Sequence, residues 1–360
     1  ESMNQKPNYR NVHNRFKLNG NNYSFNDLFE VAYSFIKEGE PHEKIIGDFL
    51  MDWINPKEEI VLKTSGSTGT PKRMRYAKQA LVNSALATGD HFGVKIGDRA
   101  LHCLSADFIA GKMMLVRAMI LGLSLELVQP SVDPMKDVYK TYDFVAMTPM
   151  QAHHSLEKLG QFKTLIIGGA PINPDLNEQL VALHNNCYET YGMTETITHI
   201  AASKLSVPKK PFHALNGIHL RVDEAGCLMV DAPDITDKLI HTNDLVEMHT
   251  ENTFTYLGRR DNVINSGGVK ISPEFVERKL AHHIKSPFFL YGSSDKILGQ
   301  KLIMVVEGRK ENISEVEKQI AACETLEKFE SPKTIHFVTK ILRNNGKYLR
   351  GKTVKYFEIA

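Results

Sequence analysis

The sequence predicts an α/β protein. We expect a large N-terminal domain of mostly parallel sheets flanked by helices with a small antiparallel subdomain, and a small α+β C-terminal domain joined by a hinge. From residue 59 to about 200, short apolar runs alternate with segments of helical period, as in βαβ units. Between 208 and 258, short strands and turns replace this alternation. Beyond 258 helices and strands mix again, so the expected domains span 1–258 and 259–360.

The spacing of apolar residues predicts the first elements. Apolar residues recur at helical intervals in 25–36 and 45–54, so two packed helices are expected there. The apolar runs 60–62, 144–147 and 165–167 are expected to be strands of the parallel sheet, because they alternate with segments of helical period.

The most apolar stretch, from Met113 to Val128, is interpreted as a buried helix followed by a buried strand. Arg117 and Glu126 interrupt it, and it is too short to cross a bilayer. No membrane insertion is therefore expected.

Turn residues and mixed periodicity predict the remaining elements. Asn216-Gly217 and Ala225-Gly226 are expected turns of the antiparallel subdomain. The expected elements of the C-terminal domain are a helix at about 273–283, strands near 288 and 302, a helix near 314 and a strand near 335.

Composition and charge exclude several classes of protein. The 360 residues are 42% hydrophobic and carry a net charge of +2, with lysine and arginine spread along the chain. A nucleic-acid partner is therefore not expected. The four cysteines form no CxxC pair and the N-terminus lacks the features of a signal peptide, so a cytoplasmic location is expected. The sequence is compatible with a homo-oligomer.

A segment rich in glycine and hydroxyl residues follows the expected strand at 60–62. Glycines let backbone N–H groups approach an anion, hydroxyls donate to its oxygens, and a lysine adds positive charge. The spacing differs from that of a P-loop, because Arg73 stands where that motif requires Ser or Thr. The predicted phosphate-binding residues are Thr64, Ser65, Gly66, Ser67, Thr68, Gly69 and Lys72.

This segment resembles the phosphate loop of the adenylate-forming superfamily, which includes acyl-CoA synthetases, adenylation domains and luciferases. Further motifs follow in the order of that family and extend to the end of the chain. The resemblance implies an enzyme that makes an acyl-adenylate from a carboxylic acid and ATP with Mg²⁺, and passes the acyl group to the thiol of coenzyme A.

Another motif, Tyr191-Gly192-Met193-Thr194-Glu195, resembles the YGxTE of the family. The resemblance implies that Tyr191 stacks on adenine, Thr194 contacts the α-phosphate, and Glu195 holds magnesium. The last role agrees with chemistry, because Mg²⁺ that bridges phosphates needs only one or two protein carboxylates. Gly192 is expected beside the acyl substrate.

Two shorter motifs complete the expected nucleotide pocket. Gly168-Gly169-Ala170 follows an apolar strand and resembles the glycine-rich turn of the family, with Gly168 toward the acyl group and Gly169 and Ala170 toward adenine. His241-Thr242-Asn243-Asp244 departs from the family's Tyr-x-Thr-Gly-Asp but keeps the aspartate. Asp244 is therefore expected to bind the ribose hydroxyls.

The longest match, residues 258–271, resembles the hinge and thiol-channel segment of the family. The resemblance implies that Arg259 faces the nucleotide, Asp261 is the hinge, and Gly267 and Gly268 leave room for the pantetheine arm.

The last motif, residues 345–350, resembles the GKxxR of the family. Its Lys347 is expected to bridge the substrate carboxylate and the α-phosphate, where negative charge must be stabilised.

The acyl substrate is predicted from residues 104–117. Amino-acid-activating relatives place an aspartate where Phe108 stands, which disfavours an amino acid, although a shift of one residue to Asp107 would reverse this. A buried Arg117 must either pair with a protein carboxylate or bind an anionic part of the substrate. Lys112, five residues earlier on the expected helix, should not share its pocket wall.

Residues 104–117 and 262–271 most resemble o-succinylbenzoate:CoA ligases of menaquinone synthesis, in which an arginine at the position of Arg117 binds the second carboxylate. The phosphate loop begins at residue 64, so this chain resembles a short form of the family. Another aryl or acyl acid, or a separate carrier protein as the thiol, remains an alternative.

Overall fold

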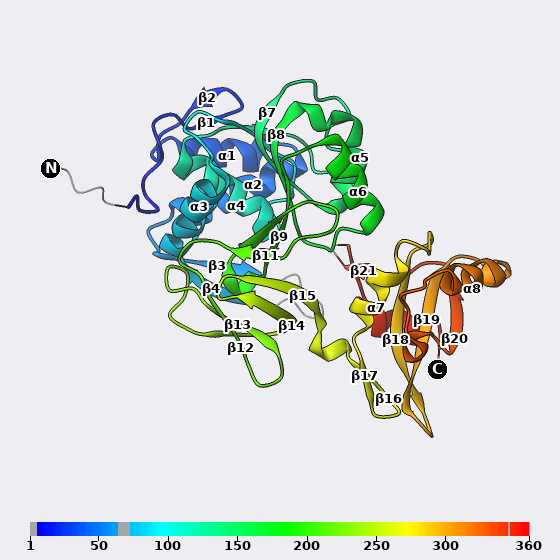
Figure 1. Cartoon of the computed structure of the whole chain (residues 1–360). Coiled ribbons are helices and arrows are strands. Elements are labelled where there is room, and N and C mark those ends of the chain that lie inside the picture. The colour runs from blue at the N-terminus through cyan, green and yellow to red at the C-terminus, as the bar shows by residue number, and fades with distance from the viewer. Residues whose placement is uncertain (1–5, 64–72, 345, 360) are drawn as a thin grey trace. The chain divides into compact units, whose positions relative to one another are not determined.

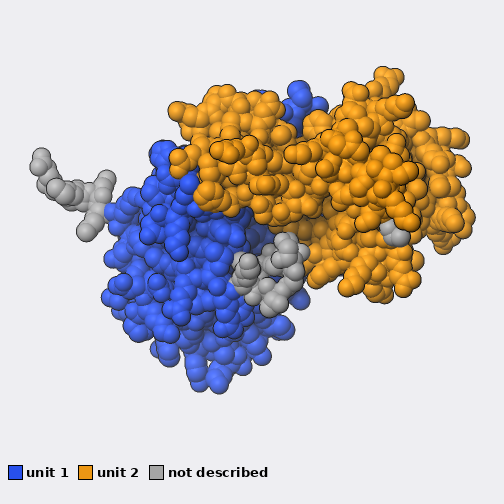
Figure 2. Space-filling view, turned by 90° about the horizontal axis from the view of Figure 1, so that it is seen from below, with its two compact units in different colours: residues 1–168, 179–219, 231–240 blue, residues 169–178, 220–230, 241–360 orange. Residues whose placement is uncertain are grey.

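The structure is a computed structural model that describes residues 6–63, 73–344 and 346–359. The chain forms two compact units, which are coloured in Figure 2. Unit 1 comprises residues 1–168, 179–219 and 231–240, and unit 2 comprises residues 169–178, 220–230 and 241–360. The division into domains at 258/259 stays a prediction.

Five α-helices lie among the described residues of unit 1. They include the two helices expected before residue 58 and the helix expected in the apolar stretch that begins at Met113. Their bounds are α1 Leu28–Glu38, α2 Pro41–Ile54, α3 Lys78–Phe92, α4 Ile109–Leu121 and α5 Pro149–His154. The helix α6 (Pro174–Leu183) has residues in both units.

A mostly parallel sheet forms the centre of unit 1, as predicted. Its five parallel strands are, in spatial order, β6 Ser124–Leu127, β5 Arg99–His102, β7 Tyr142–Met147, β8 Phe162–Ile167 and β9 Cys187–Gly192. At one edge β6 pairs with β1 (Lys17–Leu18), which pairs with β2 (Asn21–Asn22). At the other edge β10 (His199–Lys204) runs antiparallel to β9 and pairs with β11 (Phe212–Ala214).

Helices cover the parallel strands of unit 1. Figure 1 shows α1 to α4 on one side of β7 and β8 and α5 on the other. Trp53, Leu81, Val116 and Phe144, from three helices and a strand, meet in one buried apolar cluster. Such strands are apolar along their whole length because both of their faces are covered.

One expected strand does not join the parallel sheet. The strand β3 (Glu59–Lys63) pairs antiparallel with β4 (Arg73–Ala77) in a separate two-stranded sheet. Ile60 and Leu62 are buried but Val61 is 45% exposed, so the run has one wet face, which antiparallel pairs tolerate. The prediction that 60–62 belongs to the parallel sheet was therefore wrong.

Unit 2 contains most of the predicted antiparallel strands and the predicted α+β elements that follow them. The first four strands are β12 His219–Val222, β13 Cys227–Asp231, β14 Ile240–Thr250 and β15 Thr253–Arg259. The later strands are β16 Ile264–Ser266, β17 Val269–Ile271, β18 Phe288–Asp295, β19 Gly299–Glu307, β20 Thr334–Val338, β21 Arg343–Asn344 and β22 Lys347–Tyr348. Its helices are α7 Pro273–Leu280, α8 Ile313–Ala321 and α9 Arg350–Tyr356.

Pairing in unit 2 sets the positions of the later motifs. In the β14–β15 pair, Asp244 lies opposite Arg259. The strands β17, β16, β19 and β18 form a second sheet in that order, with β20 parallel to β19. Leu280, Leu290 and Met304 pack in the core of that sheet.

Candidate functional site

The carboxyl ends of the parallel strands collect the predicted residues of unit 1 at one edge of the sheet. Gly168 follows β8, and its N–H donates to the carbonyl of Met147 at the end of β7 (3.1 Å). Cys103, just after β5, donates through Sγ to the carbonyl of Ala146 (3.3 Å). Ligands of open α/β sheets bind at such strand ends.

Two glycines in this edge allow close approach of the backbone. A Cβ at Gly168 would lie 2.5 Å from the hydroxyl of Thr190, and a Cβ at Gly192 would lie 2.3 Å from the carbonyl of Thr198. Side chains at either position would displace the neighbouring strand or turn. Gly169, with φ of +88°, and Ala170 continue the turn after Gly168.

The Tyr191–Glu195 motif is joined to the strand that follows the predicted phosphate loop. The hydroxyl of Tyr76 on β4 donates to the carbonyl of Thr194 (2.8 Å). Burial, and then the nearby charge of Glu195, raise the pKa of Tyr76. Tyr76 was not predicted, because the sequence holds no signal for its role.

The predicted phosphate loop itself, Thr64 to Lys72, lies outside the described residues. The described residues that flank it, Lys63 and Arg73, are paired across β3 and β4.

A strained turn follows Glu195. Thr196 accepts a hydrogen bond from the Met193 N–H (3.1 Å) and donates to the carbonyl of Thr198 (2.8 Å). Between them Ile197 is fully buried with φ of +67°, a conformation that costs a β-branched residue about 1–3 kcal/mol. The bonds around Ile197 hold this turn and so fix the position of Thr198.

Arg117 lies on α4 and is only 2% exposed. Its Nη2 donates to Thr198 Oγ1 (3.3 Å) and its Nη1 to the sulfur of Met114 (3.4 Å), both neutral acceptors. Its Nε has no hydrogen-bond partner among the described residues. Burial lowers the pKa of Arg117 to about 9, and no described carboxylate counteracts this shift.

A neutral histidine lies next to this cation. Burial, and then the charge of Arg117, lower the pKa of His199 well below its usual range. The hydroxyl of Thr88 donates to the carbonyl of Ser84 (3.1 Å), so it accepts from His199 Nε2 (2.9 Å). Arg117 is therefore surrounded by neutral polar groups.

Phe108 and Lys112 lie at the start of α4. Phe108 is the residue before the helix and is 43% exposed. Lys112 donates to the carbonyls of Ala106 and Asp107, so its ammonium group stabilises the preceding loop.

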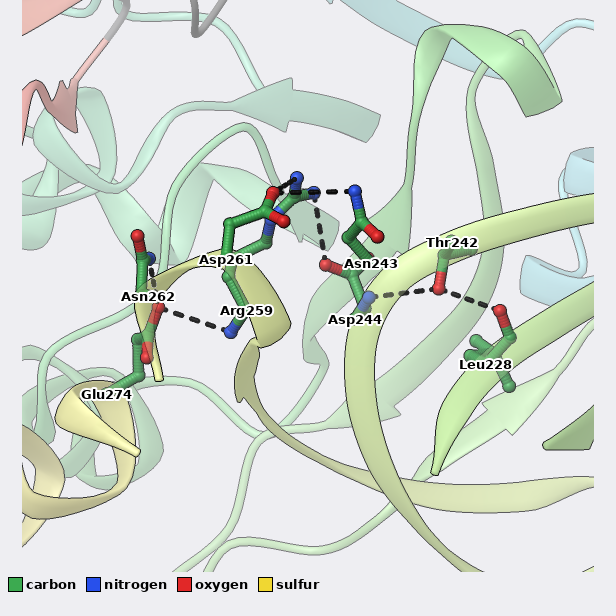
Figure 3. A network of polar contacts seen from close by, with 8 residues as sticks. All are labelled: Leu228, Thr242, Asn243, Asp244, Arg259, Asp261, Asn262 and Glu274. Carbon is green, nitrogen blue, oxygen red and sulfur yellow. Dashed lines mark hydrogen bonds and ion pairs between the residues drawn. The ribbon is translucent and has the colours of Figure 1, made fainter. Parts of the chain in front are cut away.

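In unit 2 a polar network surrounds Asp244 (Figure 3). Thr242 Oγ1 donates to the carbonyl of Leu228 (2.7 Å) and accepts from the Asp244 N–H (3.1 Å). The guanidinium of Arg259 bridges two carboxylates, with Nη1 3.3 Å from Asp244 Oδ1 and Nη2 2.9 Å from Asp261 Oδ2. The predicted ribose, nucleotide and hinge residues are therefore in contact through one side chain.

The remaining predicted residues lie on two hairpins of unit 2. Gly267 and Gly268 have φ of +59° and +84° in the turn between β16 and β17. Lys347 is exposed on β22, opposite Asn344. The roles of these residues stay predictions.

The described residues fit a magnesium ion that is held mainly by nucleotide phosphates. No group of three or more metal-ligating side chains is placed to hold an ion in the described ranges. Glu195 is exposed and can supply the single carboxylate that such an ion needs.

Among the described helices, none combines the length and apolar character that crossing a membrane requires.

Comparisons with known proteins agree with this arrangement. The model of the family described as AMP-binding enzyme matches residues 55–231. The crystal structure of an acyl-CoA synthetase (AMP-forming)/AMP-acid ligase II-like protein from Dyadobacter fermentans is 36% identical, with a TM-score of 0.59 over 91% of this chain and 97% of that one. The chain belongs to the AMP-binding enzyme family.

Other AMP-binding enzymes extend the comparison. A 2-succinylbenzoate–CoA ligase from Bacillus cytotoxicus is 27% identical over 80% of this chain and 68% of that protein. The o-succinylbenzoate CoA synthetase of Bacillus subtilis, solved with its acyl-adenylate intermediate, is 19% identical with a TM-score of 0.76 over 94% of this chain and 95% of that one, and shows the shared fold.

Proposed function

We propose that this AMP-binding enzyme joins 2-succinylbenzoate to coenzyme A at the expense of ATP. The relative from Bacillus cytotoxicus carries this activity in its name. The observation that carries the proposal is Arg117, a buried guanidinium with only neutral acceptors among the described residues. A dianionic acid has one carboxylate to activate and one to bind, and Arg117 fits the second.

In the first half of the proposed reaction, a carboxylate oxygen attacks the α-phosphorus of ATP and the bond to pyrophosphate breaks. Thr194 would donate to the α-phosphate, and Lys347 would bridge that phosphate and the attacking carboxylate. Glu195 would hold magnesium, which supplies neutralising charge at the phosphates when bound.

In the second half, the sulfur of coenzyme A attacks the acyl carbon, the thiol loses its proton, and AMP leaves. Gly267 and Gly268 would give the pantetheine arm room. We propose that residues 259–360 form a lid that rotates about Asp261 relative to residues 1–258 between the two halves. An Asp261→Pro variant that forms the thioester at the full rate would contradict this rotation.

Two further proposals concern the setting of the enzyme. Its four cysteines are free and buried, which favours a reducing cytoplasm. A homo-oligomer is testable by sedimentation of the purified chain.

The proposed function is tested by thioester formation with ATP, Mg²⁺ and coenzyme A, comparing 2-succinylbenzoate with benzoate. We expect product only from the dianionic acid, and a loss of at least about 30-fold in Arg117→Ala, because removing one partner of a buried charge pair costs about 2–5 kcal/mol. Arg99→Ala, at the amino end of β5 and 42% exposed, is the matched control and should keep full activity.

Two results would overturn the substrate assignment. One is equal turnover of benzoate. The other is an Arg117→Ala variant as active as the wild type. Pyrophosphate release with another acid, without any reaction of 2-succinylbenzoate, would retain adenylation and move the search to other acids and to carrier proteins.

A further inference from the structure

One carboxylate holds the linker on both sides of the predicted hinge. Glu274, in the first turn of α7, accepts hydrogen bonds through Oε1 from the Arg259 N–H (3.2 Å) and from the side-chain amide of Asn262. Asp261 lies between these two residues in the short helical turn Arg260–Asn262 (Figure 3). The conformation of this turn therefore depends on a residue outside it.

Gly258 makes room for this carboxylate. Its φ is +145°, and a Cβ there would lie 2.6 Å from Ser272 Oγ and 2.7 Å from Glu274 Oε2. Ser272 donates to the carbonyl of Leu257 (3.0 Å), as does Arg278 Nη2 (3.2 Å). Hydrogen bonds thus join α7 and the residue before it to the end of β15, and Glu274 adds hydrogen bonds on both sides of the predicted hinge.

The position of Glu274 leaves one of its carboxylate oxygens desolvated. Its second oxygen, Oε2, is buried and has no hydrogen-bond partner among the described residues. An unsatisfied buried acceptor costs about 1–3 kcal/mol, and more when the group is charged. Opening of the turn would let water reach this oxygen and recover that cost, so the bonds of Glu274 can break more easily than their number suggests.

The position of the nucleotide-facing arginine depends on the same contact. The Glu274 bond fixes the Arg259 backbone, while the Arg259 side chain bridges Asp244 and Asp261. A shift of the Arg259 backbone would disturb both ion pairs. Of the two aspartates, Asp261 has the more exposed side chain (56% against 11%), so its pair with Arg259 is weakened more by solvent.

We propose that Glu274 is a positioning residue that staples the linker in the arrangement seen here and releases it when the lid moves between the two half-reactions. The proposal rests on the proposed function, because it needs two half-reactions with different lid positions. Loss of the staple should change the balance between the half-reactions more than the stability of the fold.

The test compares Glu274→Ala with Glu274→Gln in each half-reaction separately. Adenylation is followed by exchange of pyrophosphate into ATP, and thiolation by reaction of the preformed acyl-adenylate with coenzyme A. We expect the ratio of the two rates to change at least about fivefold in Glu274→Ala. Glu274→Gln keeps an acceptor oxygen for both donors, so its ratio should stay within about twofold of the wild type.

Glu315→Ala is the matched control, because Glu315 lies in the first turn of α8 and is exposed. It removes the same charge from a helix N-terminus without touching the linker. An unchanged ratio in Glu274→Ala, or a glutamine variant as impaired as the alanine variant, would overturn the proposal.

Limited trypsin cleavage tests the staple without relying on any substrate. Cleavage after Arg259 should accelerate at least about fivefold in Glu274→Ala, whereas cleavage after Lys95, before the exposed Ile96, should not change. Equal acceleration at both sites would indicate general destabilisation and contradict the staple. Failure of the wild type to use 2-succinylbenzoate, together with this cleavage pattern in Glu274→Ala, would refute the substrate and leave the staple intact.

Discussion

Arg117 in unit 1 is buried and Arg350 in unit 2 is partly buried, and the two arginines are held in opposite ways. Arg350, at the start of α9, forms two hydrogen bonds with the carboxylate of Glu277, one of them from Nη2 to Oε2 at 2.9 Å. Glu277 also accepts from the Leu290 N–H (2.8 Å), and Arg350 donates to the Leu290 carbonyl (3.0 Å). Arg117 has a thioether and a hydroxyl as its acceptors.

The difference in hydrogen-bond acceptors indicates different roles for the two arginines. A charge shielded from solvent is tolerated when it is paired and hydrogen-bonded, as Arg350 is, and its pair with Glu277 joins α7, β18 and α9. A buried charge with neutral partners is costly for the free protein. Arg117 is therefore better explained by a ligand than by the stability of the fold.

The largest expected effect is on the paired arginine. Arg350→Met should destabilise unit 2 by about 3–5 kcal/mol, because it leaves the partly buried Glu277 carboxylate without its charged partner. Hydrogen exchange of the Leu290 amide measures this loss, since that amide donates to Glu277.

The control for Arg350→Met is the fluorescence of Trp53, the single tryptophan, which is fully buried in unit 1. The free energy of unfolding of unit 1, measured from the urea transition of Trp53 fluorescence, should fall less than the free energy of opening measured by hydrogen exchange at Leu290. Unaltered exchange at Leu290 in Arg350→Met would remove the distinction between the two arginines.

Arg117→Met should behave in the opposite way. Replacing an unpaired buried cation by an apolar side chain of similar length removes a desolvation cost, so the free protein should keep its stability or gain about 1–4 kcal/mol. Urea unfolding followed by Trp53 fluorescence measures this change. A loss of more than about 2 kcal/mol would assign Arg117 a structural role like that of Arg350.

The sequence predicted much of the fold and only part of the site. The apolar runs of β7 and β8 predicted their strands, because a strand covered on both faces has few polar positions. Ile60, Val61 and Leu62 gave the same signal in an antiparallel pair, since a short apolar run does not reveal its partner.

Residues that act through tertiary contacts were harder to predict. Arg117 was recognisable as a buried charge, but the absence of a described carboxylate partner is visible only in the fold. Tyr76, Thr198 and Glu274 were missed because each acts by bonding to a backbone or side chain distant in the sequence. A motif rich in polar residues indicates where the reaction occurs. It does not indicate which residues from other parts of the chain position the side chains of that motif.

A smaller effect should appear in the pH dependence of stability, through the neighbour of Arg117. The unfolded chain protonates His199 near pH 6.5, whereas the folded protein does not until much lower pH. Below about pH 6.5 the unfolded state thus binds one more proton at His199 than the folded state does. The free energy of unfolding therefore falls by about 1.4 kcal/mol for each unit by which the pH decreases. His102, whose pKa is lowered to about 4 by burial, adds to this loss.

His199→Gln should remove only its own part of this slope. The free energy of unfolding of the variant is measured with urea between pH 5 and 8 and plotted against pH. Below pH 6.5 its slope should be smaller than that of the wild type by the equivalent of about one proton, and above pH 7 the two curves should differ by a constant amount. Parallel curves over the whole range would show that His199 binds protons equally in the folded and unfolded states and is not kept neutral beside Arg117.

The smallest expected effect concerns the hydroxyl that contacts Arg117. Thr198→Val removes the acceptor of Nη2 and should raise the KM for 2-succinylbenzoate about 2- to 10-fold with little change in kcat, because a hydrogen bond contributes about 0.5–1.5 kcal/mol. Thr198→Ser keeps the hydroxyl and should retain the KM of the wild type. A fall in kcat at constant KM would mean that Thr198 serves the reacting carboxylate, and Arg117 would then lie at the reacting end of the acid and not at its second carboxylate.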